Sequence, residues 1–327
     1  MLSQHIRTFF DRFTIILIAV VVVATLLPAT GRGALLFHWL TTFAITLLFF
    51  MHGAKLSRGA IVAGLTHWRL HILVLACTFL VFPLLSVGLR PLIQSLVGEP
   101  LAIGIVFLCV LPGTVQSAIA FTSLAKGNVP AAICSASASS ILGIVLTPLL
   151  VALLLGVRIG TGASLLDAIL GISLELLVPF IAGHLSRPLI GAWIDRHRDI
   201  LGAVDQSSIL LVVYTAMSAS VVEGLWTAVD ARQLIGLGVI CCILLALILG
   251  LTSWLGRYLG FNREDRITIV FCGSKKSLAN GVPMASVLFA GAMLGPALLP
   301  LMIFHQLQLM VCAVMAQRYA CHADANG

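Results

Sequence analysis

Residues 271–283 read FCGSKKSLANGVP, and two adjacent lysines stand there inside an otherwise apolar stretch. A charged lysine at the centre of a membrane helix costs about 2.5–3.5 kcal/mol on insertion scales. The same stretch contains glycine and proline, which interrupt helices. Lys275 and Lys276 therefore indicate either a loop outside the membrane or a polar site within it, and the rest of the chain bears on that choice.

The chain has too few charged residues for a water-soluble protein. Of its 327 residues, 60% are hydrophobic and 9% are charged, and the mean hydropathy is +1.12. Soluble domains carry about 25% charged residues. The apolar segments are continuous rather than alternating at period two, which favours helices over barrel strands. We therefore predict an all-α integral membrane protein, with the lipid bilayer as its surroundings.

Ten spans are predicted, of which the fourth and the ninth are broken: 13–27, 35–51, 72–89, 101–124, 130–155, 163–185, 200–222, 233–255, 267–288 and 297–315. With the N-terminus inside, 13 Lys and Arg residues fall in inside loops and 4 in outside loops, and Lys275 and Lys276 complete the 19. This excess predicts a multi-pass protein of the plasma (inner) membrane with both termini in the cytoplasm. The net charge of +7 is then a topology signal, and no nucleic-acid partner is expected.

A short pattern occurs twice, in the fourth and the ninth predicted spans. LPGTVQSAIAF (111–121) aligns with FCGSKKSLANG (271–281) at an offset of 160 residues, close to half the chain. Each copy falls in the fourth span of a five-span half, which predicts two repeats, 1–157 and 158–327, in one membrane domain. Because five is odd, the second half must be inverted relative to the first. The aligned residues are Gly113 with Gly273, Thr114 with Ser274, and Ser117 with Ser277.

Helix-breaking residues accompany both copies of the pattern. Pro112 and Gly113 are expected to interrupt the fourth span, and Gly273, Gly281 and Pro283 the ninth. Broken helices at membrane depth occur where the freed backbone groups are buried in protein or line a wet cavity. Paired breaks in inverted halves are typical of a transporter's binding site, and open helix N-termini suit an anion. We expect the two breaks to face each other near the midplane and to bind a small organic anion.

Four segments carry a family resemblance: PGTVQSAIAFTSLAKGNV (112–129), SASASSILGIVLTPLL (135–150), GSKKSLANGVPMA (273–285) and HQLQL (305–309). In them the chain resembles the bile acid:sodium symporter family over nearly its whole length, and within it the bacterial symporter branch that is similar to the seventh human member. The resemblance implies ten helices in two inverted five-helix repeats, with the fourth and ninth helices crossing at their breaks. It also implies secondary transport of an organic anion together with sodium.

The sodium ligands that the resemblance implies are mostly replaced. Family members carry a Ser-Asn pair after the fourth-helix break, where this chain has Ser117 followed by alanine. Hydroxyls early in the fifth helix become Ala132 and Ala136, and the acidic ligand of the ninth helix becomes Ser274 or Lys275. Hard oxygen ligands suit an alkali cation. Sodium coupling is therefore expected from the family, while proton coupling and uncoupled transport stay open.

The two lysines and nearby polar residues supply the candidate site. One ammonium is expected to occupy the place of sodium in the relatives, and the other to face a substrate carboxylate or sulfonate. The substrate-binding candidates are Thr114, Gln116, Ser117, Ser274, Lys275, Lys276, Ser277, Asn280, His305 and Gln308. The ion-coupling candidates are Ser117, Ser135, Ser274 and Glu175.

Several of these residues also have structural interpretations. Glu175 either acts in coupling or pairs with a lysine, and Asp205 either has a function or caps a helix near the cytoplasmic edge. His305 and Gln308 are three residues apart and share a helix face, so they either line the cavity or bond to neighbouring helices.

The function predicted is secondary active transport by alternating access around the two breaks. A non-transporting metabolite sensor is the alternative outside the transporter class. Ser123 and Lys126 match S-x-x-K, but the companion motifs of that enzyme class are missing, as are nucleotide-binding and metalloprotease motifs. No enzymatic activity, no resident cofactor and no protein-bound metal site are expected.

Overall fold

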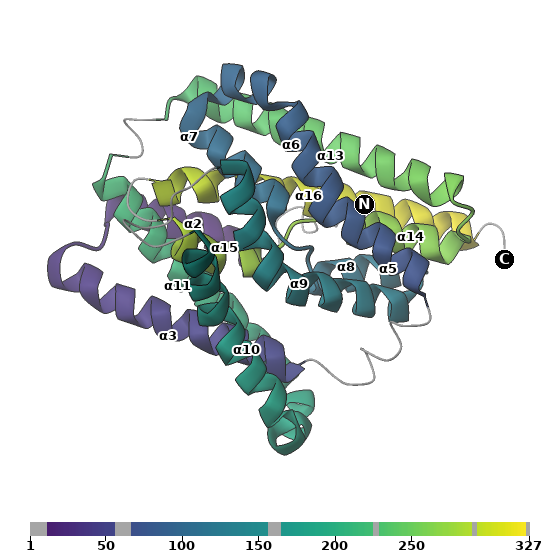
Figure 1. Cartoon of the computed structure of the whole chain (residues 1–327), viewed down its shortest axis with the longest axis horizontal. Helices are drawn as coiled ribbons and strands as arrows, with labels where there is room; N and C mark the ends of the chain where they lie inside the picture. The colour runs from purple at the N-terminus through teal and green to yellow at the C-terminus, as the bar shows by residue number, and fades with distance from the viewer. Residues whose placement is uncertain (1–11, 56–66, 156–164, 225–228, 290–292, 325–327) are drawn as a thin grey trace.

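The computed structural model describes residues 12–55, 67–155, 165–224, 229–289 and 293–324, and this part of the chain forms helices and no strand. α13 shows why a helix begins where it does, since the Asp230 side chain accepts from Gln233 N at 2.7 Å and the Gln233 side chain accepts in return from Asp230 N at 3.0 Å. The elements (Figure 1) are α2 (Arg12–Leu26), α3 (Gly31–Lys55), α5 (Trp68–Ala76), the π-helical turn η1 (Cys77–Val81), α6 (Phe82–Gly88), α7 (Arg90–Val110), α8 (Gln116–Leu124), α9 (Val129–Leu155), α10 (Leu165–Arg196), α11 (Arg198–Val222), α13 (Ala231–Tyr258), α14 (Arg263–Gly273), α15 (Leu278–Leu288) and α16 (Leu294–Asp324).

Eight helical segments in the described residues are long and apolar enough to cross a membrane. They are Gly31–Lys55, Trp68–Gly88, Arg90–Val110, Val129–Leu155, Leu176–Ile194, Ile200–Val222, Ala231–Tyr258 and Leu294–Cys321. The prediction of an all-α, multi-pass membrane protein is confirmed at this level. The two other predicted spans correspond to α2, whose apolar stretch Ile15–Leu26 is short, and to α14 and α15, which have 11 residues each.

The helices pack in two groups, and each group takes helices from both predicted repeats. The α3 group consists of α2, α3, α10 and α11: α10 packs mainly on α3, and α11 packs on α2 and α3 (Figure 1). The α7 group consists of the other helices, among which α15 and α16 also touch α11. Within the α3 group, a Cβ at Gly53 would collide with the Phe180 carbonyl oxygen, and one at Gly183 with that of Phe50. Glycine therefore lets α3 and α10 touch through their backbones.

The first break separates α7 from α8, as Pro112 and Gly113 predicted. Residues 111–115 are not helical. Gly113 N donates to Ser139 Oγ at 2.9 Å, so a buried backbone donor freed by the break has a side-chain acceptor. Pro112 packs against Gly143, where a Cβ would lie 2.6 Å from the Pro112 Cβ. The break is thus held by residues of α9.

The second break is shorter than the sequence suggested. Residues 274–277 separate α14 from α15, and Gly273 ends α14 as expected. Gly281 and Pro283, however, lie inside α15, so the prediction that they interrupt the span was wrong. Pro283 stands in the second turn of α15, where it removes one intrahelical hydrogen bond without ending the helix. The two breaks touch, since Ser277 N donates to Pro112 O at 2.9 Å.

A π-helical turn in the span Trp68–Gly88 leaves one carbonyl free. Phe82 N donates to Cys77 O, five residues back. In the same register the residue at position 83 would donate to Thr78 O, but that residue is Pro83, which has no N–H. The Thr78 carbonyl is therefore open to a donor from elsewhere in the chain.

Candidate functional site

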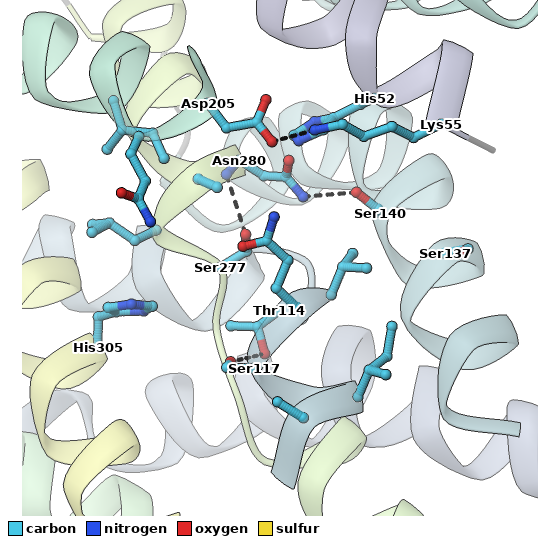
Figure 2. Close-up of a pocket in the computed structure, with 18 of the residues that line it drawn as sticks. His52, Lys55, Thr114, Ser117, Ser137, Ser140, Asp205, Ser277, Asn280 and His305 are labelled. Atoms are coloured by element: carbon cyan, nitrogen blue, oxygen red, sulfur yellow. Dashed lines mark hydrogen bonds and ion pairs between the residues drawn. The ribbon is translucent and has the colours of Figure 1, made fainter. Parts of the chain in front are cut away.

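A pocket of about 520 Å³ lies between the α3 group and the α7 group. From the α3 group it is lined by residues such as His52, Lys55 and Asp205. The α7 group contributes the two breaks, part of α9, and α16. Figure 2 shows the polar side chains converging on this space. Six of the predicted substrate-binding residues line it: Thr114, Gln116, Ser117, Ser277, Asn280 and His305.

The N-terminal turns of α8 and α15 both open on the pocket. α8 begins at Gln116 and α15 at Leu278, and both residues line the cavity. Ser277 caps α15, with its Oγ accepting from Asn280 N at 3.2 Å. Ser117 Oγ donates to Thr114 Oγ1 at 2.9 Å. Two helix N-termini, each with free N–H groups and a partial positive charge, therefore face one space.

Asn280 joins the pocket wall to α9 and leaves one atom unpaired. Its Nδ2 donates to Ser140 Oγ at 2.8 Å (Figure 2). Its Oδ1 is buried and has no hydrogen-bond partner among the described residues, although the residue is only 2% exposed. Buried polar atoms are normally paired. Asn280 thus presents an unused acceptor beside the cavity.

Gln308 fixes both the second break and the tautomer of His305. Its Oε1 accepts from Lys276 N at 2.8 Å and its Nε2 donates to Lys276 O at 2.9 Å, so the amide is oriented by the backbone. The second hydrogen of Nε2 then points to His305 Nδ1, which lies 2.9 Å away. A neutral His305 with Nδ1 as the acceptor carries its proton on Nε2. His305 therefore offers the pocket an N–H donor.

Lys276 is held by three main-chain carbonyls and is fully buried. Its Nζ donates to Thr78 O and Cys109 O at 2.8 Å and to Leu111 O at 2.7 Å. The Thr78 carbonyl is the one that Pro83 leaves free, and the other two lie at the C-terminal end of α7, where helical carbonyls lack partners. An ammonium has three donors, so all of them are used.

Lys275 lies among aromatic rings. Its Nζ donates to Ser117 O at 3.0 Å and lies 4.0 Å from the Phe121 ring centroid and 5.2 Å from that of Phe271. Cation–π attraction stabilises an ammonium in such a place. Neither Lys275 nor Lys276 belongs to the pocket lining in the part of the chain that the structure describes. Their assignment as substrate-binding residues, like that of Ser274 and Gln308, stays a prediction.

The predicted ion-coupling residues are scattered in the structure. Ser274, the residue that follows α14, donates its Oγ hydrogen to Val270 O of the same helix at 2.6 Å. Ser135 Oγ is 2.6 Å from His71 Nδ1 and is fully buried. The side chain of Glu175 lies outside the described residues. No two of the three described residues, Ser117, Ser135 and Ser274, share a hydrogen bond.

Sequence reasoning named Asp205 but missed its pairing with Lys55. Asp205 lies well inside α11 and its carboxylate is ion-paired with Lys55 Nζ, so the interpretation of Asp205 as a helix cap was wrong. Lys55 was counted only as a topology charge. His52, one turn before Lys55, was not considered. The available signal was a carboxylate within a predicted span, which asks for a nearby cation.

Known proteins match this chain over nearly its whole length. The model of the SBF-like CPA transporter family matches residues 11–321. An uncharacterized protein of Pseudomonas aeruginosa is 63% identical over 314 residues, which cover 96% of this chain and 94% of that protein. "Putative symporter YfeH" of Escherichia coli is 56% identical over 94% of this chain and 92% of its own length. "Sodium/bile acid cotransporter 7-B" of Xenopus laevis is 30% identical over 93% and 90%. These matches confirm the resemblance that the four segments predicted.

Proposed function

Because the chain belongs to the SBF-like CPA transporter family, we propose that it is a secondary transporter that carries an organic anion across the membrane. The observation that carries this proposal is that two helix N-termini, those of α8 and α15, line one pocket. The partial positive charge and the free N–H groups at the N-termini of α8 and α15 favour binding of a carboxylate or sulfonate. The relatives named as a symporter and a sodium/bile acid cotransporter support the transport class.

The substrate is proposed to bind with its anionic group near the breaks and its apolar part in the rest of the pocket. His305 Nε2 and the Thr114 hydroxyl, which accepts from Ser117 Oγ, are the side-chain donors for the anionic group. Isoleucine and phenylalanine side chains from both helix groups supply apolar wall for an organic body. In this proposal Gln308 and the two lysines act behind the wall, by fixing the second break and its neighbours.

Alternating access is proposed as movement of the α3 group against the α7 group. The pocket lies between these groups, and the contact between the breaks lies within the α7 group. We propose ten spans in two inverted halves, 1–157 and 158–327, with the broken fourth and ninth spans crossing at the bond from Ser277 N to Pro112 O. With both termini in the cytoplasm of an inner-membrane protein, the lining residues Phe13 and Lys55 stand at cytoplasmic ends of α2 and α3. The described state is then inward-facing.

The coupling ion is proposed not to be sodium at the second break, because the chain supplies its own cation there. Three carbonyls without a backbone donor, two of them at the C-terminal end of α7, make a site of negative potential. The Lys276 ammonium fills it with three hydrogen bonds of 2.7–2.8 Å and lies 4.2 Å from the Phe82 ring centroid. A permanently tethered cation leaves no vacancy for sodium at this position.

The test is ligand-dependent stability followed by transport. Purified protein would be heated with taurocholate, estrone sulfate or p-aminohippurate, in sodium chloride and in potassium chloride. A ligand at 100 times its Kd should stabilise by about 2.7 kcal/mol, and the two salts should give the same shift. His305→Leu removes a proposed donor to the anion and should abolish the shift, whereas Ser95→Ala, an exposed position in α7, should keep it.

Uptake into proteoliposomes separates transport from sensing. A stabilising anion should accumulate with time in vesicles that contain the protein and not in empty ones. Stabilisation without uptake would favour a sensor, and stabilisation by no anion of the panel would overturn the proposed function. A shift that requires sodium would overturn the tethered-cation argument alone.

A further inference from the structure

The proposed function leaves one charged pair in the pocket without a role. Lys55, the last residue of α3, pairs its ammonium with Asp205 Oδ2 of α11, and both residues line the cavity (Figure 2). Among the described lining residues, Lys55 is the only lysine or arginine and Asp205 the only acidic residue. The pair therefore sets the formal charge of the pocket that an incoming anion meets. While Lys55 and Asp205 are ion-paired, their summed charge is zero.

Asp205 is poorly satisfied as a carboxylate. Its side chain is 7% exposed, and its Oδ1 is buried without a hydrogen-bond partner among the described residues. A buried carboxylate with one free oxygen depends on its lysine partner for most of its stabilisation. Lys55 is different, since 29% of its side chain is exposed and its ammonium can turn toward water or a ligand.

We propose that this pair couples anion binding to the uptake of one proton. A proton from water binds the Asp205 carboxylate, the hydrogen bond from Lys55 to Oδ2 breaks, and the freed ammonium donates to an oxygen of the substrate anion. On release the anion leaves, the proton returns to water and the pair closes. One proton accompanies each negative charge, so transport of a monovalent anion is electroneutral. This mechanism rests on the proposed function, because it requires an anion in the pocket.

The helices packed against α11 carry other titratable groups, which the experiment has to separate from Asp205. From α3, His52 is close enough to interact electrostatically with both Asp205 and Lys55, and its Nδ1 is buried without a described partner. From α10, His184 has a buried Nδ1 without a described partner, and Arg187 donates to Ala54 O at 2.6 Å. α16 brings His305, on the wall beside the breaks.

The two remaining helices that pack on α11, α2 and α15, contribute no charged residue to the described lining of the pocket. α2 contributes Phe13 to the lining, and α15 contributes only neutral residues, of which Asn280 also presents an unpaired oxygen. His52 is the nearest competing base, so the design includes a variant at that position.

The experiment measures protons taken up per anion bound. Purified protein in weakly buffered solution is mixed with taurocholate, estrone sulfate or p-aminohippurate, proton uptake is followed with a pH indicator, and anion binding is measured on the same samples. The wild type should take up one proton per anion bound. Its affinity for the anion should therefore fall about tenfold for each unit that the pH rises, over the pH range in which the proton is taken up. Asp205→Asn should bind the anion with no proton uptake and no such pH dependence. Lys55→Gln should lose most of the affinity.

Three further variants make the result decisive. Glu99→Gln removes a carboxylate from the exposed pair with Arg90, outside the pocket, and should behave as the wild type. His52→Gln should keep one proton per anion, and loss of proton uptake in it would assign the proton to His52 and overturn the proposal. If Asp205→Asn fails to fold, Asp205→Ser removes the carboxylate and keeps Lys55 for the anion, and it should bind the anion with no proton uptake.

The two proposals fail in different ways. Anion binding without proton uptake in the wild type, or wild-type proton uptake in Asp205→Asn or Asp205→Ser, overturns the coupling mechanism and leaves the transporter standing. Failure of the wild type to bind any anion of the panel at any pH overturns the proposed function, and the coupling mechanism with it.

Discussion

Replacement of Lys276 by alanine should destabilise the protein by an amount that can be estimated from its contacts. Lys276 Nζ satisfies three buried carbonyls, those of Thr78, Cys109 and Leu111, and lies 4.2 Å from the Phe82 ring centroid. Each buried acceptor left unpaired costs about 1–3 kcal/mol, and the lost cation–π contact about 0.5–2 kcal/mol. Removal of a buried charge offsets part of this sum. We expect a net loss of about 3–5 kcal/mol.

The measurement is thermal unfolding of the detergent-purified variant. A domain of more than about 150 residues shifts its Tm by about 2–4 °C per kcal/mol, so Lys276→Ala should unfold roughly 6–10 °C below the wild type at the lower end of that scale. Lys275→Ala is the matched control, because Lys275 makes one hydrogen bond, to Ser117 O. Lys275→Ala also loses the contacts with the Phe121 and Phe271 rings, so its Tm should fall as well, but by less than that of Lys276→Ala.

The tethered-cation argument adds a rescue experiment. Lys276→Ala leaves three carbonyl oxygens around an empty space, and oxygen ligands suit a small hard cation. Sodium or methylammonium at 100 times its Kd should recover about 2.7 kcal/mol in this variant, while choline at equal ionic strength should recover none. Neither the wild type nor Lys275→Ala should respond. A Tm equal to that of the wild type, or equal rescue by choline, would refute the reasoning.

The remaining predictions concern other supports of the site. Gln308→Leu removes both hydrogen bonds to the Lys276 backbone and the donor to His305, and should lower the free energy of unfolding by about 2–4 kcal/mol. An unchanged Tm in thermal unfolding would mean that these hydrogen bonds do not stabilise the second break. Ser277→Ala removes the cap of α15 and should cost about 1 kcal/mol, and a loss below the error of the melting curve would argue against the cap. Gly53→Val should prevent close packing of α3 on α10 and abolish folded expression, whereas a Cβ at Gly33 meets open space, so Gly33→Ala should be expressed as the wild type.

Eight of the ten predicted spans correspond to helices in the described residues that are long and apolar enough to cross a membrane, and the sequence predicts them because hydropathy is a local signal. Pro112 and Gly113 predicted the first break correctly. Gly281 and Pro283 misled, since α15 continues through both of them, and the second break is instead held by tertiary hydrogen bonds to its backbone, such as that from Lys276 N to Gln308 Oε1. Such bonds come from residues far away in the chain, and no local pattern encodes them.

The lysine pair shows the same limit for the site. Burial of Lys275 and Lys276 in the protein was predictable from their cost in lipid, but their partners were not. One binds carbonyls that a π-helical turn and a helix end leave free, and the other lies among aromatic rings. The pair Lys55 and Asp205 was missed because its members are 150 residues apart and each had a simpler local interpretation.

The carbonyls that hold Lys276 also have a consequence for biosynthesis. Thr78, Cys109 and Leu111 all precede residue 157, whereas the ammonium that satisfies them arrives more than 160 residues after the last of the three. A nascent chain that ends before residue 276 therefore lacks the donor for three buried backbone acceptors, and these carbonyls stay unpaired until the second break has been synthesised. Truncation of the protein anywhere between Leu111 and Lys276 removes the same donor.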